Sequence, residues 1–272
     1  MLDAHRHEDS APEPTGILAE VAGLVRFLSR IPLPQMGRDD QLDKAPDFRL
    51  SARSIPLAGV IISLPSLFVL VALSPSALPS SVVALLAVAT SAAVQGCLHE
   101  DGFADVFDGF FGGHTAERRL EIMKDSRIGA FGASALILSL SLRWVLLASL
   151  LDRFGGVGAA FGFLAAETAG RLCMVWVWHL MPAAYQGGLS SRFGAPQNIA
   201  AYWATCFALP LIAFSLTALG FWQMVMGCVV SAVLVWGLSA VAWQKIKGIT
   251  GDVLGSAQQV GSIGFLLGAL AL

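Results

Sequence analysis

The chain has 272 residues, of which 56% are hydrophobic and only 13% charged, and its mean hydropathy is +0.69. A soluble domain carries about 25% charged residues, so the composition excludes an ordinary soluble protein and predicts a polytopic membrane protein with an all-α fold. The formal net charge of -2 argues against nucleic acid as a partner.

The first segment, residues 1–16, is charged and contains two prolines and a glycine, which predicts a disordered, uncleaved tail rather than a signal peptide. Residues 17–33 follow with apolar side chains on one face and Glu20, Arg26 and Arg30 among them, the pattern of an amphipathic helix on the membrane surface. We expect residues 17–272 to form a single membrane-embedded catalytic domain.

About seven apolar segments follow, and each is close to the roughly 20 residues that a helix needs to cross a bilayer. They are residues 56–73, 78–98, 130–151, 157–181, 199–219, 221–243 and a short last piece, 263–272. The four cysteines lie singly inside apolar segments and without regular spacing, so they are expected to be small buried residues rather than disulfides or zinc ligands.

Basic residues occur almost entirely in alternate connections between these segments. The connections that carry them contain Arg26 to Arg53, then Arg118 to Arg127, then Arg192, then Lys245 and Lys247, whereas the others contain only Arg153. Because Lys and Arg near span ends mark the cytoplasmic side, we expect a multi-pass protein of the bacterial cytoplasmic (inner) membrane with its polar segments, including 185–198, on the cytoplasmic face.

Three ionisable residues remain inside predicted spans: Arg143, Glu167 and Arg171. Each costs about 2.5–3.5 kcal/mol at the centre of a spanning helix, so they are expected to face the interior of the bundle. Glu167 and Arg171 are spaced to form an i,i+4 ion pair. A second interpretation of Arg171 is a cation that reaches substrate phosphate.

The most unusual stretch is residues 98–109, which holds four acidic residues between two apolar segments. In a helix Asp101, Asp105 and Asp108 share one face, with phenylalanines on the other. Like charges at this spacing repel one another, and with Glu100 they form an oxygen-only set that suits Mg²⁺ or Mn²⁺. The alternative is a solvated amphipathic helix between two spans, and the charge pattern by itself leaves both open.

Cations suited to phosphate follow this stretch, namely Arg118, Arg119, Lys124 and Arg127. Asp252 adds a carboxylate in a second polar stretch, residues 247–255, which contains three glycines and is equally typical of a re-entrant connection. His99 is a candidate proton acceptor or hydrogen-bonding residue, or a histidine at the membrane interface.

Several of these stretches together resemble the signature of the cobalamin synthase family, the adenosylcobinamide-GDP ribazoletransferases. The resemblance lies in residues 27–32, 96–109, 117–118, 120–132 and 250–255, in the family's order and over nearly the full chain. Two departures are Cys97, where the family usually has glycine, and the pair Gln258 and Gln259 with Gly261, where it tends to carry an acidic residue.

The resemblance implies an enzyme that joins adenosylcobinamide-GDP to α-ribazole 5'-phosphate or α-ribazole and releases GMP, with Mg²⁺ required. On this basis the expected metal ligands are Glu100, Asp101, Asp105 and Asp108, and the expected substrate-binding residues are Arg118, Lys124, Arg127, Arg171 and Asp252. One of His99, Asp101, Asp105, Asp108 and Asp125 is expected to accept the proton of the attacking hydroxyl.

Three other functions were weighed against this one: a membrane phosphotransferase that acts on a lipid alcohol, a divalent-cation transporter, and a scaffold without catalysis. A transporter would hold its carboxylates inside spans near the midplane, and a scaffold leaves the repulsive acidic face unexplained. The transferase is therefore favoured. The sequence leaves the oligomeric state open, a homo-oligomer included.

Overall fold

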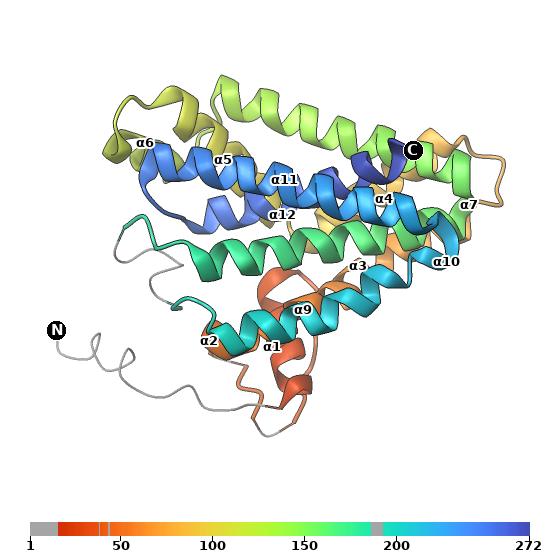
Figure 1. Cartoon of the computed structure of the whole chain (residues 1–272), viewed down its shortest axis with the longest axis horizontal. Coiled ribbons are helices and arrows are strands. Elements are labelled where there is room, and N and C mark those ends of the chain that lie inside the picture. The colour runs from red at the N-terminus through yellow and green to blue at the C-terminus, as the bar shows by residue number, and fades with distance from the viewer. Residues whose placement is uncertain (1–15, 38, 43, 186–192) are drawn as a thin grey trace.

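The computed structural model describes residues 16–37, 39–42, 44–185 and 193–272. Residues 1–15 of the predicted disordered tail, Arg38, Asp43 and residues 186–192 of the 185–198 connection, Arg192 included, lie outside the described residues. In the described part of the chain the fold is entirely helical, apart from an isolated parallel bridge between Ala183 and Ile249. Long helices lie side by side in a bundle (Figure 1), which confirms the predicted all-α membrane fold.

The bundle begins with three short elements and two apolar helices. These are α1 (Ile17–Leu28), α2 (Phe48–Ser51), the 3-10 turn η1 (Ala52–Ser54), α3 (Ile55–Leu73) and α4 (Ser80–Gln95). The helix expected at the N-terminus is confirmed, but its apolar face packs on protein rather than on lipid. Leu24 and Val25 are fully buried, and Glu20 forms an ion pair of 2.8 Å with Arg53.

The chain then turns sharply into α5 (Leu98–Gly112), which carries the acidic residues, and α6 (Ala116–Met123). Gly96 and Cys97 both adopt left-handed backbone angles, with φ of 62° and 57°, and α4 and α5 are bent by 88° at this point. Glycine adopts such angles without strain. The bend makes α4 and α5 a broken span or a re-entrant loop rather than one straight crossing.

The 51-residue α7 (Ala130–Leu180) is two antiparallel helices in one. Gly155 is non-helical, with φ of 69°. Arg143 and Glu167, which lie equally far from Gly155 on either side, approach to 3.2 Å, so the chain must double back between them, as the green ribbon does in Figure 1. Each half is long enough to cross a bilayer.

The remaining helices are α9 (Asn198–Ala213), α10 (Leu216–Leu219), α11 (Phe221–Ile246) and α12 (Gly251–Leu270). Five described helices are long and apolar enough to span a membrane, or six with the bent α4–α5 pair. That count takes α7 as one helix, so its two antiparallel halves raise the total to six, or to the seven crossings predicted where the bent α4–α5 pair is one span.

The last span differs from the prediction. It was expected to start near residue 263, after a polar connection, but α12 already starts at Gly251 and 83% of its most apolar stretch is buried inside the protein. The Thr250 side chain caps it by accepting a hydrogen bond from the backbone N–H of Val253. Asp252 therefore lies in the first turn of a central helix that packs against α5, α7 and α11.

Candidate functional site

The exposed acidic residues lie where α5 meets the start of α12. On α5, Asp101 is exposed and Asp105 is partly buried. A side chain at Gly102 would come within 2.9 Å of the Cα atom of Asp252, and the Ser256 hydroxyl donates a 3.2 Å hydrogen bond to the Gly102 carbonyl. The absence of a Cβ at Gly102 thus allows α12 to bring Asp252 to the acidic face of α5.

Three carboxylates act electrostatically on a fourth at this junction. Burial and the charges of Asp101, Asp252 and Asp108 all oppose ionisation of Asp105. No ion pair in the described part of the chain includes Asp101, Asp105 or Asp252, and Asp252 accepts one hydrogen bond from Thr250. Such an arrangement is unfavourable without a cation, so the acidic face is suited to bind one. We call these three residues the acidic site.

Asp108 shares the predicted face but has a structural role in the fold. It is 8% exposed, and its two carboxylate oxygens accept hydrogen bonds of 2.6 and 2.8 Å from the backbone N–H groups of Gly129 and Gly132. It therefore caps the start of α7, where the helix dipole favours negative charge. Both glycines lie against the Asp108 carboxylate, and neither has room for a side chain.

Glu100 was expected to bind metal, but the structure directs it into the protein. It is 3% exposed, accepts a hydrogen bond of 2.9 Å from Arg143, and accepts another of 3.0 Å from Gln259. The next residue along α5, Asp101, is exposed. Successive residues of a helix point about 100° apart, which separates Glu100 from the acidic site.

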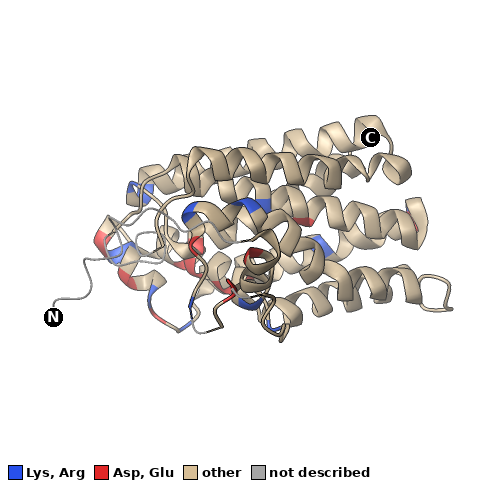
Figure 2. Cartoon of the chain, turned by 90° about the horizontal axis from the view of Figure 1, so that it is seen from below, with Lys and Arg blue, Asp and Glu red and all other residues tan. Residues whose placement is uncertain are grey.

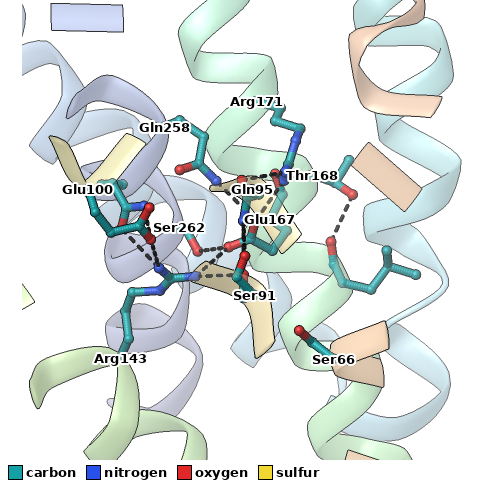
Figure 3. Close-up of polar contacts among 12 residues, drawn as sticks. Ser66, Ser91, Gln95, Glu100, Arg143, Glu167, Thr168, Arg171, Gln258 and Ser262 are labelled. Atoms are coloured by element: carbon teal, nitrogen blue, oxygen red, sulfur yellow. Dashed lines mark hydrogen bonds and ion pairs between the residues drawn. The ribbon is translucent and has the colours of Figure 1, made fainter. Parts of the chain in front are cut away.

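Glu100 belongs to a buried network that joins four helices (Figure 3). At its centre Glu167 contacts Arg143 at 3.2 Å and Arg171 at 2.7 Å, which confirms the predicted i,i+4 pair with Arg171. Gln258 and Ser262 donate to Glu167, and Arg171 donates to Gln95. Two glutamates balance two arginines, as buried charges require.

Arg171 is fully buried in this network, so the alternative that it reaches substrate phosphate finds no support in the geometry. Gln258 and Gln259, noted for their departure from an acidic residue, donate to Glu167 and Glu100 respectively. An acid at either position would instead place a further negative charge beside a buried glutamate. No spacing pattern in the sequence indicates that Arg143 pairs with Glu100, because the two residues lie on different helices.

His99 lies within the protein rather than on the open face. It is 2% exposed, its Nε2 atom has no hydrogen-bond partner, and it packs against the backbone at Gly255 of α12. The interface position and the direct proton-transfer role considered for it both require exposure that it lacks. The structure thus places it behind the acidic site.

The predicted phosphate-binding cations lie at the end of the bundle where most charged residues gather (Figure 2). Arg118 pairs with Glu121 at 3.0 Å, and Arg127 pairs with Asp125 at 2.6 Å, all at least 38% exposed. Lys124 lies 4.0 Å above the ring of Tyr185. Because these contacts are exposed and weak, the side chains can exchange them for a phosphate.

Asp125 and Arg119 also take part in hydrogen bonds. Hydrogen bonds from the Arg127 side chain and backbone lower the pKa of Asp125 to about 2, which makes it a weak proton acceptor at neutral pH. Arg119 donates to the carbonyl groups of Gly113 and Lys245 and so ties α6 to α11.

The acidic site does not form a complete metal cage by itself. In the described residues no group of three or more His, Cys, Asp or Glu side chains is arranged to hold an ion. Mg²⁺ usually takes only one or two protein carboxylates and completes its shell with water and substrate phosphates. The unpaired oxygen ligands of Asp101, Asp105 and Asp252 fit that kind of site.

The chain is similar to a family of known proteins. The family model described as cobalamin-5-phosphate synthase matches residues 20–270. A protein of Brucella anthropi named adenosylcobinamide-GDP ribazoletransferase is 42% identical over 243 residues, which cover 89% of this chain and 92% of the relative. A protein of Brucella ovis with the same name is 38% identical over 259 residues, covering 93% and 96%. No solved structure matches the chain.

Proposed function

Since the chain belongs to the cobalamin-5-phosphate synthase family, we propose that its reaction takes place at the acidic site of α5 and α12. The reaction joins adenosylcobinamide-GDP and α-ribazole, or its 5'-phosphate, to give adenosylcobalamin or its 5'-phosphate and GMP. It belongs to the last steps of cobalamin nucleotide-loop assembly. The observation that carries the assignment is the set of unpaired carboxylates at Asp101, Asp105 and Asp252.

These three residues are proposed to hold Mg²⁺ together with the diphosphate of the donor substrate. When bound, the ion supplies charge neutralisation at the reacting phosphoryl group and at the leaving phosphate. Asp108 does not bind the ion in this proposal; it holds the start of α7 against α5 by accepting hydrogen bonds from Gly129 and Gly132. Glu100 is left out of this ligand set because Arg143 already holds it.

The chemistry requires one bond to form and one to break. A hydroxyl oxygen of the ribazole bonds to the phosphorus that carries the cobinamide, the bond to the bridging oxygen breaks, and GMP leaves with that oxygen. The hydroxyl proton passes to a carboxylate. Asp101 and Asp105 are the best candidates because they are on the open face, whereas His99 is buried and Asp125 is a weak base.

The exposed cations on and after α6 are proposed to neutralise the negative charge of the substrate phosphates that Mg²⁺ leaves uncompensated. Arg118 lies in α6 and Lys124 and Arg127 follow it, at one end of the bundle (α6 in Figure 1), and each can leave its present contact at little cost. Lys and Arg residues are more numerous in the connections at this end of the bundle than in those at the other end, which supports a cytoplasmic active site in the inner membrane.

The test is GMP release by the purified chain in lipid vesicles with adenosylcobinamide-GDP, α-ribazole 5'-phosphate and Mg²⁺. Asp105→Asn should lose activity, and EDTA should abolish activity in the unaltered chain. Asp152→Asn, a change of an exposed carboxylate at the turn of α7, is the matched control and should remain active.

Two results would contradict the proposal. Absence of GMP release by well-folded protein would remove the reaction, whereas full activity of Asp105→Asn would retain the reaction and remove the acidic site as its location.

A further inference from the structure

Arg30 lies outside any helix, but contacts with α4 and Gly96 fix its position. It follows α1, and its backbone N–H donates a 2.7 Å hydrogen bond to the carbonyl of Val94 near the end of α4. Its side chain lies across Gly96, where an added Cβ would overlap the Arg30 Nε atom. Glycine is thus required at position 96 for two reasons: the backbone is left-handed there, with φ of 62°, and a side chain would occupy the space of the Arg30 side chain.

The guanidinium of Arg30 has no hydrogen-bond or ion-pair partner among the residues that the structure describes. Every other arginine whose side chain the structure describes takes part in a hydrogen bond or an ion pair; Arg30 is exposed and takes part in neither. A guanidinium carries five N–H donors, so the exposed Arg30 is free to donate charge-assisted hydrogen bonds to an anionic ligand.

A cavity of about 140 Å³ lies beside Arg30 and reaches Leu98, the first residue of α5, one turn before Asp101. It is lined by Arg30, Gly96 and Leu98, and also by Gln95 and Arg26. Leu98 is three residues before Asp101, so both lie on the same side of α5. The other three polar side chains already have partners, since Arg26 pairs with Asp40, the Ser29 hydroxyl donates to the Val25 carbonyl and the Gln95 oxygen accepts from Arg171. Of the residues that line the cavity, Arg30 is therefore the cation that is free to bind a ligand there.

We propose that Arg30 binds the diphosphate of the donor substrate, adenosylcobinamide-GDP. An arginine fork matches two phosphate oxygens at once, and the cavity places it on the α1 side of the acidic site. The diphosphate would then lie between Arg30 and the carboxylate-bound cation. This inference rests on the proposed function and adds a substrate-binding residue to it.

The first experiment compares steady-state kinetics of Arg30→Ala and Arg30→Lys with the unaltered chain in vesicles. Arg30→Ala should raise KM for adenosylcobinamide-GDP about 10- to 100-fold, the effect of losing charge-assisted hydrogen bonds, and leave KM for α-ribazole 5'-phosphate unchanged. Arg30→Lys should recover part of the loss. Millimolar guanidinium should restore Arg30→Ala, and Arg153→Ala at the turn of α7 should behave as the unaltered chain.

The second experiment measures binding without turnover. Without α-ribazole 5'-phosphate no transfer takes place, and under these conditions the dissociation constant of the coloured donor should rise by a similar factor when Arg30 is replaced by alanine. An unchanged dissociation constant and KM in an active enzyme would overturn the role of Arg30 while leaving the reaction intact. A rise in KM for the acceptor instead of the donor would also overturn it. If the unaltered chain releases no GMP, the proposed function itself fails.

Discussion

The Arg143 guanidinium lies 2.9 Å from the Glu100 carboxylate, although the two residues are 43 positions apart. The contact joins the first half of α7 to α5 immediately before Asp101. Because Gln259 of α12 donates to the same Glu100 oxygen, the buried network also sets how α5 and α12 meet. The acidic site thus lies next to a buried network in which two glutamates and two arginines balance in charge and hold the helices together.

Removal of Arg143 should be strongly destabilising. Arg143→Met leaves Glu100 without its cation and Glu167 with only Arg171, and loss of one partner of a buried pair costs about 3–5 kcal/mol. The measurement is the free energy of unfolding in detergent. Arg143→Met combined with Glu100→Gln should recover part of the loss, because the buried charges balance again; a double variant less stable than the single one would contradict the charge argument.

The close approach of α5 and α12 depends on Gly102. Gly102→Ala should lower activity and destabilise by about 1–3 kcal/mol, the usual cost of overpacking, because the added methyl group meets backbone atoms of Asp252 that cannot move aside. Gly237→Ala on α11 is the matched control, since nothing lies within 4 Å of its added Cβ. Equal behaviour of the two variants would show that this contact is unimportant.

The acidic site should be unfavourable for folding when no metal is present. In EDTA, Asp105→Asn should be more stable than the unaltered chain, by on the order of 0.5 kcal/mol per relieved like-charge pair, since it removes a charge opposed by three others. With Mg²⁺ the order should reverse, because a ligand stabilises the form that binds it. Thermal unfolding with and without Mg²⁺ measures both. A stability loss in EDTA would argue that Asp105 has a favourable partner.

Asp125 should not control the pH dependence of the reaction. Its pKa is lowered from 3.8 to about 2 by Arg127, so the stabilising contact is present above pH 3.8 and is lost only as the pH falls through about 2. The carboxylate therefore remains charged throughout the neutral range. Asp125→Asn should leave the shape of the pH–rate profile unchanged; loss of its acidic limb would identify Asp125 as the proton acceptor.

Much of the fold followed from local patterns. Apolar length predicted the crossings, and basic residues in alternate connections predicted that the polar segments meet at one end. Helical spacing alone placed Asp101 and Asp105 together and paired Glu167 with Arg171. These features depend on residues within one or two turns of each other, so the sequence contains all that is needed to recognise them.

Other features depend on which helix faces meet, and they were decided only by the tertiary structure. Glu100 was grouped with the aspartates because it is adjacent to them in the sequence, but it pairs with Arg143 of α7. Asp252 reaches the acidic site because α12 begins earlier than its apolar pattern indicated. Arg30 meets Gly96 only because the chain bends there by 88°. Sequence periodicity determines which residues share a helix face, whereas bends at Gly96 and Gly155 determine what that face touches.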